Sequence, residues 1–266
     1  MADSEVDQQR LVIQRNNEAV IMIQRGEFTE AKKLLMDALR EIRSRRNADR
    51  LQPGDSTDGS SLESLCLDQW MVSSTEALHT RLSEAATQSF FVYPKGILVP
   101  INFFQDNENR YCHVDVTAAI SSVICFNQGL ACQLAHIRAP AQSRDVKSLQ
   151  KASALYRLSI QGTRHRQQSM PAEDNSVTNA NFLIAAMNNL AVSERIYDIS
   201  TSTKASSSEE EGPEVNYQYF ETLRSFLLNW RPSTSNSPDE ILWIHYLENV
   251  LRGCDLEQSN YSVIPV

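Results

Sequence analysis

Two amphipathic stripes joined by a tight turn near the amino terminus constrain this chain more than any other feature. The first stripe consists of Val12, Arg15, Ala19, Met22 and Ile23, and the second of Phe28, Ala31, Leu34, Leu35, Ala38, Leu39 and Ile42. Both recur at helical spacing, so each helix has one face to bury. Gly26 lies between them, where a left-handed backbone ends a helix at little cost. These features predict an antiparallel helix pair.

A second copy of this pattern begins at Ala118. Its first helix contains Phe126-Asn127-Gln128-Gly129-Leu130 and is apolar nearly all round, which favours a central position in the fold. A partner helix is expected over residues 148–161, where Ala152 and Tyr156 have the spacing of Ala31 and Leu35.

A third and weaker copy starts near Val177. Ala186-Met187-Asn188-Asn189-Leu190-Ala191 lies on its first helix, and residues 215–230 would form the partner. The sequence Ser237-Pro238-Asp239-Glu240 then has the N-cap serine and first-turn proline of a helix start. We expect a single helix over residues 238–252, covering the last pair as a cap.

The pattern resembles the tetratricopeptide repeat, whose ~34 residues contain a small residue, a turn glycine, an aromatic and an Ala-x-x-x-aromatic element. In the first copy these roles fall to Ala19, Gly26, Phe28, Ala31, Leu35 and Ala38. The resemblance implies an all-α, α-α superhelix of about three helix pairs plus a capping helix, in a single domain. The expected divisions are repeat 1 at about 8–46, a linker and insertion at 47–114, repeat 2 at about 115–167, repeat 3 at about 176–231 and the capping helix at about 238–252.

The insertion contains one segment of a different kind. Between residues 90 and 101, β-branched and aromatic residues flank Tyr93-Pro94-Lys95-Gly96, which favours either a short hairpin or an extended segment docked on helices. Whether residues 62–88 form a further repeat stays open.

Composition excludes several functions. The net charge of −8 over 266 residues disfavours a general phosphate-backbone binder, so no nucleic-acid partner is expected. The five cysteines form no CxxC pair, and no catalytic or phosphate-binding motif occurs, so the chain is expected to be neither an enzyme nor a metal or cofactor protein. Residues 1–30 contain no secretory signal and no ~20-residue apolar run suggests a membrane span. We expect an intracellular protein, cytoplasmic rather than nuclear.

The resemblance implies a protein-protein interaction module or assembly scaffold, in which a concave groove holds a peptide or a partner's helix. The groove residues would be Ile13, Asn16, Val20, Ile23, Val123, Phe126, Asn127, Leu130, Leu134, Ala185, Asn188, Asn189, Val192 and Arg195. In the central repeat the same residues are equally well interpreted as core. The alternative function is a constitutive structural subunit of a larger complex, and an enzyme is a distant third. The partner's identity and the oligomeric state stay open.

Ser206, Ser207 and Ser208 are each followed by a glutamate three residues later. This spacing suits acidophilic kinases, and each phosphate would add about −1.5 to −2 charges. The alternative is a passive, solvated linker.

Overall fold

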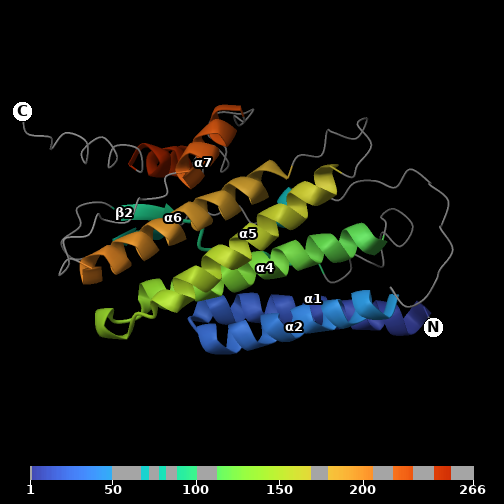
Figure 1. Cartoon of the computed structure of the whole chain (residues 1–266). Coiled ribbons are helices and arrows are strands. Elements are labelled where there is room, and N and C mark those ends of the chain that lie inside the picture. The colour runs from blue at the N-terminus through green and yellow to red at the C-terminus, as the bar shows by residue number, and fades with distance from the viewer. Residues whose placement is uncertain are drawn as a thin grey trace, which may run out of the picture.

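The computed structural model describes residues 2–49, 67–71, 78–81, 89–100, 113–168, 179–205, 218–229 and 243–252. Most of these residues are helical, which confirms the predicted all-α class, and one short antiparallel strand pair accompanies the helices. Figure 1 shows the helices following one another in chain order across the molecule, from α1 and α2 at one side to α7 at the other.

The first helix pair forms where the two stripes predicted it. Helix α1 spans Ala2–Arg25 and α2 spans Phe28–Asp49, and the two pack against each other. Gly26 has a φ of 83°, the left-handed conformation that the turn requires, and its N–H donates to the carbonyl of Ile23 at 3.1 Å. The glycine predicted to end the first helix therefore does so.

The second pair consists of α4, His113–Arg138, and α5, Val146–Gln168. A 3-10 turn at Ala141–Ser143 joins them, and the Asp145 carboxylate caps α5 by accepting from the N–H of Lys147 at 3.0 Å. Helix α4 packs against α2 and α5 and also contacts α1 and α6, so it is central. Among the described residues, the stretch Val116–Arg138 is long and apolar enough to cross a membrane, and its burial among the other helices accounts for that character.

The third pair packs on the second. Helix α6, Ala180–Ala205, lies against α5, and the shorter α7, Gln218–Asn229, lies against α6. A further helical run occupies residues 243–252. It is attached through the indole N–H of Trp243, which donates to the carbonyl of Leu227 at 3.3 Å, so this run follows α7 in the series.

The strand pair does not agree with the hairpin, the first of the two alternatives predicted for residues 90–101. Strand β2, Ser89–Val92, pairs with β1, Leu78–Arg81, in an antiparallel register that places Leu78 opposite Val92. Residues 93–100 form neither helix nor strand, so no hairpin turns at Tyr93 to Gly96. The reason is that helix side chains, rather than a second strand, bond the backbone of these residues. Within 62–88 the described elements are β1 and a 3-10 turn at Leu67–Trp70, and neither is an α-helix.

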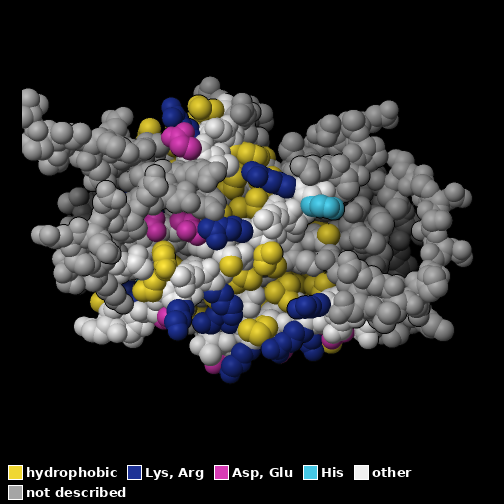
Figure 2. Space-filling model, in the orientation of Figure 1, with side chains coloured by type: hydrophobic (Ala, Val, Ile, Leu, Met, Phe, Trp, Pro, Cys, Tyr) yellow, Lys and Arg dark blue, Asp and Glu magenta, His cyan; other side chains and the backbone are white. Residues whose placement is uncertain are grey.

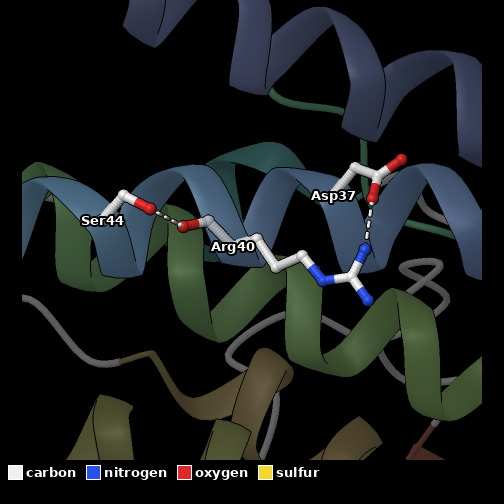
Figure 3. Close-up of polar contacts among 3 residues, drawn as sticks. All are labelled: Asp37, Arg40 and Ser44. Carbon is white, nitrogen blue, oxygen red and sulfur yellow. Dashed lines mark hydrogen bonds and ion pairs between the residues drawn. The ribbon is translucent and has the colours of Figure 1, made fainter.

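The outer face of α2 is a solvated helix surface. Figure 3 shows Arg40 reaching back along the helix to Asp37, with 2.9 Å between nitrogen and oxygen, while the Ser44 hydroxyl donates to the Arg40 carbonyl at 3.0 Å. In Figure 2, Lys and Arg side chains are spread along the lower part of the molecule, where α1 and α2 lie. An exposed pair of this kind stabilises a protein by about 0–1 kcal/mol, so this face contributes little to the fold.

Candidate functional site

Three asparagines on three helices hold the backbone of residues 93–99, which we call the docked segment. Asn189 of α6 accepts from the N–H of Tyr93 at 2.8 Å and donates to its carbonyl at 3.1 Å. Asn127 of α4 does the same to Ile97, at 2.7 and 2.9 Å. Asn17 of α1 does the same to Val99, at 2.9 and 2.7 Å. We call Asn17, Asn127 and Asn189 the amide ladder, and the side of α1, α4 and α6 that contacts the docked segment the inner face.

The amide ladder takes the place of a neighbouring β-strand. A carboxamide has one acceptor oxygen and a donor nitrogen, as a peptide group does. In an extended chain, backbone groups point the same way at every second residue, and positions 93, 97 and 99 are separated by even numbers. The asparagines therefore satisfy one edge of the docked segment, as buried backbone groups require.

A fourth asparagine joins the ladder across α1 and α4. Asn16 donates to the Ile97 carbonyl at 3.1 Å and accepts from Asn127 at 2.8 Å. Its amide also lies 3.1 Å from the side-chain oxygen of Asn17. The carbonyl of Ile97 thus has two donors, and the side chains of Asn16 and Asn127 are fully buried.

The third asparagine of the amide ladder, Asn189, is contacted by a buried tyrosine. The Tyr156 hydroxyl of α5 donates to Gln133 at 2.7 Å and lies 3.4 Å from the Asn189 amide nitrogen. Gln133 in turn donates to the Asn189 backbone carbonyl at 3.2 Å. Burial raises the pKa of Tyr156 well above 10, so its hydroxyl keeps the proton that it donates.

The docked segment buries the side chains of the residues that the ladder holds. Tyr93, Ile97 and Val99 are at most 1% exposed, whereas Leu98 is 38% exposed. The ring of Tyr93 meets Phe126 edge-on, with 6.2 Å between centroids. From Ile97 to Pro100, buried and exposed residues alternate, as is typical of an extended chain with one face inward.

Gly96 of the docked segment packs closely against Val20 of α1. A Cβ added to it would lie 2.9 Å from Cγ2 of Val20 and 3.0 Å from Cγ1. Val20 is itself fully buried and β-branched, so its methyl groups have little freedom to move. A glycine is therefore needed here for close approach.

The structure places all fourteen predicted groove residues on α1, α4 and α6, and all but the partly exposed Arg195 are buried. Asn16, Asn127 and Asn189 bond the docked segment, and Val20 and Phe126 touch or face it. Asn188 instead accepts from Asn249 at 2.6 Å, which ties residues 243–252 to α6. The other buried residues of the predicted groove belong to the hydrophobic core: Ile13, Ile23, Val123, Leu130, Leu134, Ala185 and Val192.

Sequence reasoning missed Asn17 and Gly96. A signal for Asn17 was present, because Asn17-x-Ala19, Asn127-x-Gly129 and Asn189-x-Ala191 place one asparagine two residues before a small residue on each first helix. Those small residues allow close helix packing: a Cβ on Gly129 would lie 3.0 Å from the Tyr156 ring. No local pattern marks Gly96, since its need for space arises only against Val20.

A pocket that we call the outer pocket lies between α5, α6 and α7 and has a volume of about 260 Å³. It is lined by Arg157, Ile160, Gln161, Arg164, Met187, Leu190 and Thr222. Arg157 pairs with Glu194 at 2.8 Å, and Arg164 lies 3.7 Å from the sulfur of Met187. In Figure 2, apolar side chains lie next to Lys or Arg side chains over the middle of the molecule, where Figure 1 places α5 and α6.

The described residues include two cysteines, together with His, Asp and Glu side chains of the kinds that bind metal ions. No group of three or more His, Cys, Asp or Glu side chains among these residues is placed to hold a metal ion. Burial raises the pKa of Cys125 to about 11 and also raises that of Cys132, so both thiols stay protonated near neutral pH. Ser206, Ser207 and Ser208 lie outside the described residues, as do residues 50–66 of the predicted linker and insertion at 47–114.

No protein-family model, curated protein or solved structure matches this chain. We therefore base the proposed function on the geometry of the candidate site.

Proposed function

We propose that this chain is a protein-protein interaction module or assembly scaffold whose inner face is a groove for an extended polypeptide. The observation that supports this most is the amide ladder, which holds a polypeptide by its backbone at three points. Recognition through main-chain hydrogen bonds is a general way for a protein to bind an extended peptide.

The buried amides are difficult to explain as packing alone. An amide taken from water without hydrogen bonds costs about 1–3 kcal/mol by protein mutational data, whereas an apolar residue of similar size stabilises a core. Asn17, Asn127 and Asn189 occur at the same place in three helix pairs. A shared requirement to bind polypeptide backbone accounts for that recurrence.

The proposed architecture is a tetratricopeptide-like superhelix with α1, α4 and α6 as the inner helices and α2, α5 and α7 outside them. The order of packing along the chain supports it. The run at 243–252 would be the cap, since Trp243 bonds α7 and Asn249 bonds α6. The expected partner is a protein or peptide, and the expected location is the cytoplasm.

Affinity purification from the native cell tests the function. The full chain, Asn17→Ala and the outer-pocket control Arg157→Gln would serve as baits, with circular dichroism to establish that each is folded. We expect specific co-purifying proteins whose amounts change with Asn17→Ala, which alters the ladder, and not with Arg157→Gln. An identical set from all three baits, or none above the background, would contradict the proposal.

The alternative, a constitutive subunit of a larger complex, draws on exposed apolar side chains. Leu158 of α5 is 55% exposed, Leu228 of α7 is 70% exposed and Leu251 is 55% exposed. A permanent partner would cover such residues. A purified chain that stays monomeric and soluble favours the module, whereas one that aggregates without a co-expressed partner favours the subunit.

A further inference from the structure

We propose that residues 93–99 are an internal copy of the ligand of this groove, and that the groove selects extended peptides with a glycine opposite Val20 and apolar residues three before, one after and three after it. This inference rests on the proposed function. It names the chemistry of the partner: a peptide of the pattern apolar-x-x-Gly-apolar-x-apolar, which must displace the docked segment to bind.

The glycine is selected by space. Both methyl groups and the Cβ of Val20 lie 2.9 to 3.3 Å from where a Cβ on Gly96 would stand. Among the described glycines only Gly26 has a positive φ, so Gly96 is required for its size and not for an unusual backbone conformation. Any side chain at this position has to move either α1 or the peptide.

The apolar positions are selected by burial. Tyr93, Ile97 and Val99 are enclosed, and Tyr93 lies against Phe126. Pro94 and Lys95 are only partly buried and Leu98 is exposed, so those positions accept many residues. A peptide with a charge at 97 or 99 would bury it without a partner, which is strongly unfavourable.

The amide ladder contributes affinity without reading side chains. Its bonds to residues 93, 97 and 99 involve backbone atoms only, and any residue except proline offers the same pair. Selectivity therefore comes from the glycine and the apolar positions, and register comes from the spacing of the three asparagines.

Occupation by the chain itself makes binding competitive. Because the docked segment is part of the same chain, it competes intramolecularly with any added peptide, so a free peptide binds wild-type protein weakly. Weakening the internal copy should expose the groove to peptides added in trans.

The test uses the full chain and a fluorescent synthetic peptide with the sequence of residues 89–101, followed by anisotropy. Gly96→Val is expected to expel the docked segment and to bind this peptide at least tenfold more tightly than wild type does. A control peptide with valine in place of the glycine should bind that variant at least tenfold more weakly. Equal binding of the two peptides would overturn the glycine selection.

A second pair of variants keeps the proposal testable if Gly96→Val does not fold alone. Gly96→Ala should lower the melting temperature of the chain, and adding Val20→Ala should restore a large part of the loss, because the shortened side chain makes room for the new methyl group. Unchanged melting of Gly96→Ala, or no rescue by Val20→Ala, would contradict the proposed contact.

Failure of this inference and failure of the proposed function give different results. If partner proteins co-purify but neither peptide binds Gly96→Val in folded form, the ligand pattern is wrong and the interaction module stands. If the glycine peptide binds selectively but no cellular protein co-purifies, the pattern stands and the module function does not.

Discussion

The inner face and the outer pocket both contain polar side chains, but these side chains differ in burial and in hydrogen-bond partners. On the inner face, Asn16, Asn127 and Asn189 are fully buried and bonded to backbone. In the outer pocket, Arg157 has a side chain that is 43% exposed, and its pairing with Glu194 competes with water.

This difference in burial predicts which polar side chains stabilise the fold. Removing one partner from a buried pair leaves the other unsatisfied, which costs about 1–3 kcal/mol, whereas an exposed pair is replaced by solvent. The inner face should therefore tolerate few substitutions and fix one register of the docked segment. The outer pocket should tolerate many.

The largest expected change in stability comes from Asn127→Leu, which removes the central asparagine of the amide ladder. The substitution leaves the N–H of Ile97 without its acceptor and the side-chain oxygen of Asn16 without its donor. We expect a loss of about 2–5 kcal/mol in the free energy of unfolding, measured by urea denaturation. Arg164→Met in the outer pocket is the matched control and should change it by less than about 1 kcal/mol. Similar losses for the two variants would contradict the expected difference between the inner face and the outer pocket.

A smaller effect should follow from Gly129→Ala, behind the ladder. The new methyl group would lie 3.0 to 3.2 Å from three ring carbons of the enclosed Tyr156, which also lies near Asn189. We expect a net loss of about 1–2 kcal/mol, since overpacking outweighs a gain in helix propensity of up to about 1 kcal/mol. The measurement is thermal or urea unfolding.

Gly162→Ala on α5 is the control for that contact. Its Cβ would lie 2.7 Å from Oγ of Ser122 and 4.0 Å from Cβ of Ser122. A χ1 rotation of this small side chain relieves the clash, although it breaks the hydrogen bond from the hydroxyl to the Ala118 carbonyl. Its stability should change less than that of Gly129→Ala, and the reverse order would show that the Tyr156 ring yields easily.

A pH-dependent effect should come from His136, near the end of α4. Burial, together with the charge of Arg144, lowers the pKa of His136 below its ordinary 6.5, and its Nδ1 lies 3.0 Å from the Asp145 carbonyl. The unfolded chain therefore takes up the proton more readily, so this contribution to stability is full above about pH 6.5 and is lost as the pH falls below that value. His136→Asn should flatten the dependence between pH 7.5 and 5 in urea titrations. If the free energy of unfolding of His136→Asn depends on pH as strongly as that of wild type, other groups cause the dependence.

The smallest effect is expected from Arg157→Gln, which removes the ion pair at the outer pocket. The pair is partly exposed, so the change in the free energy of unfolding should be under about 1 kcal/mol and should shrink further in high salt. Urea denaturation at two salt concentrations checks this. A loss comparable to that of Asn127→Leu would mean that the outer pocket, too, is a structural site.

The helices could be predicted well because their signals are local. The stripe from Phe28 to Ile42 and the turn at Gly26 need only neighbours three and four residues away, and the left-handed Gly26 ends the helix as expected. The apolar character of α4 likewise indicated its central position. The short strand was expected near Phe90, but its partner at Leu78–Arg81 was not, because strand pairing depends on contacts that a single segment does not encode.

The candidate site was predicted only in part. Asn16, Asn127 and Asn189 were proposed to line a groove, whereas Asn17 was missed although the Asn-x-small spacing contains it. Residues 90–101 were interpreted as a hairpin or as an extended segment docked on helices. The second alternative agrees with the docked segment, but the asparagines that hold its backbone were not predicted.

The sequence by itself determined the helical class, the turn at Gly26 and the recurrence of one asparagine before a small residue in three helices, because periodicity and turn chemistry act over a few residues. Only the tertiary structure decided that Tyr93 meets Asn189, 96 residues away, and that Ile97 meets Asn16, 81 residues away. Carboxamide-to-backbone bonds have no periodic signature, since every residue offers the same N–H and carbonyl. The tight fit of Gly96 against Val20 exists only once the segment lies on the inner face.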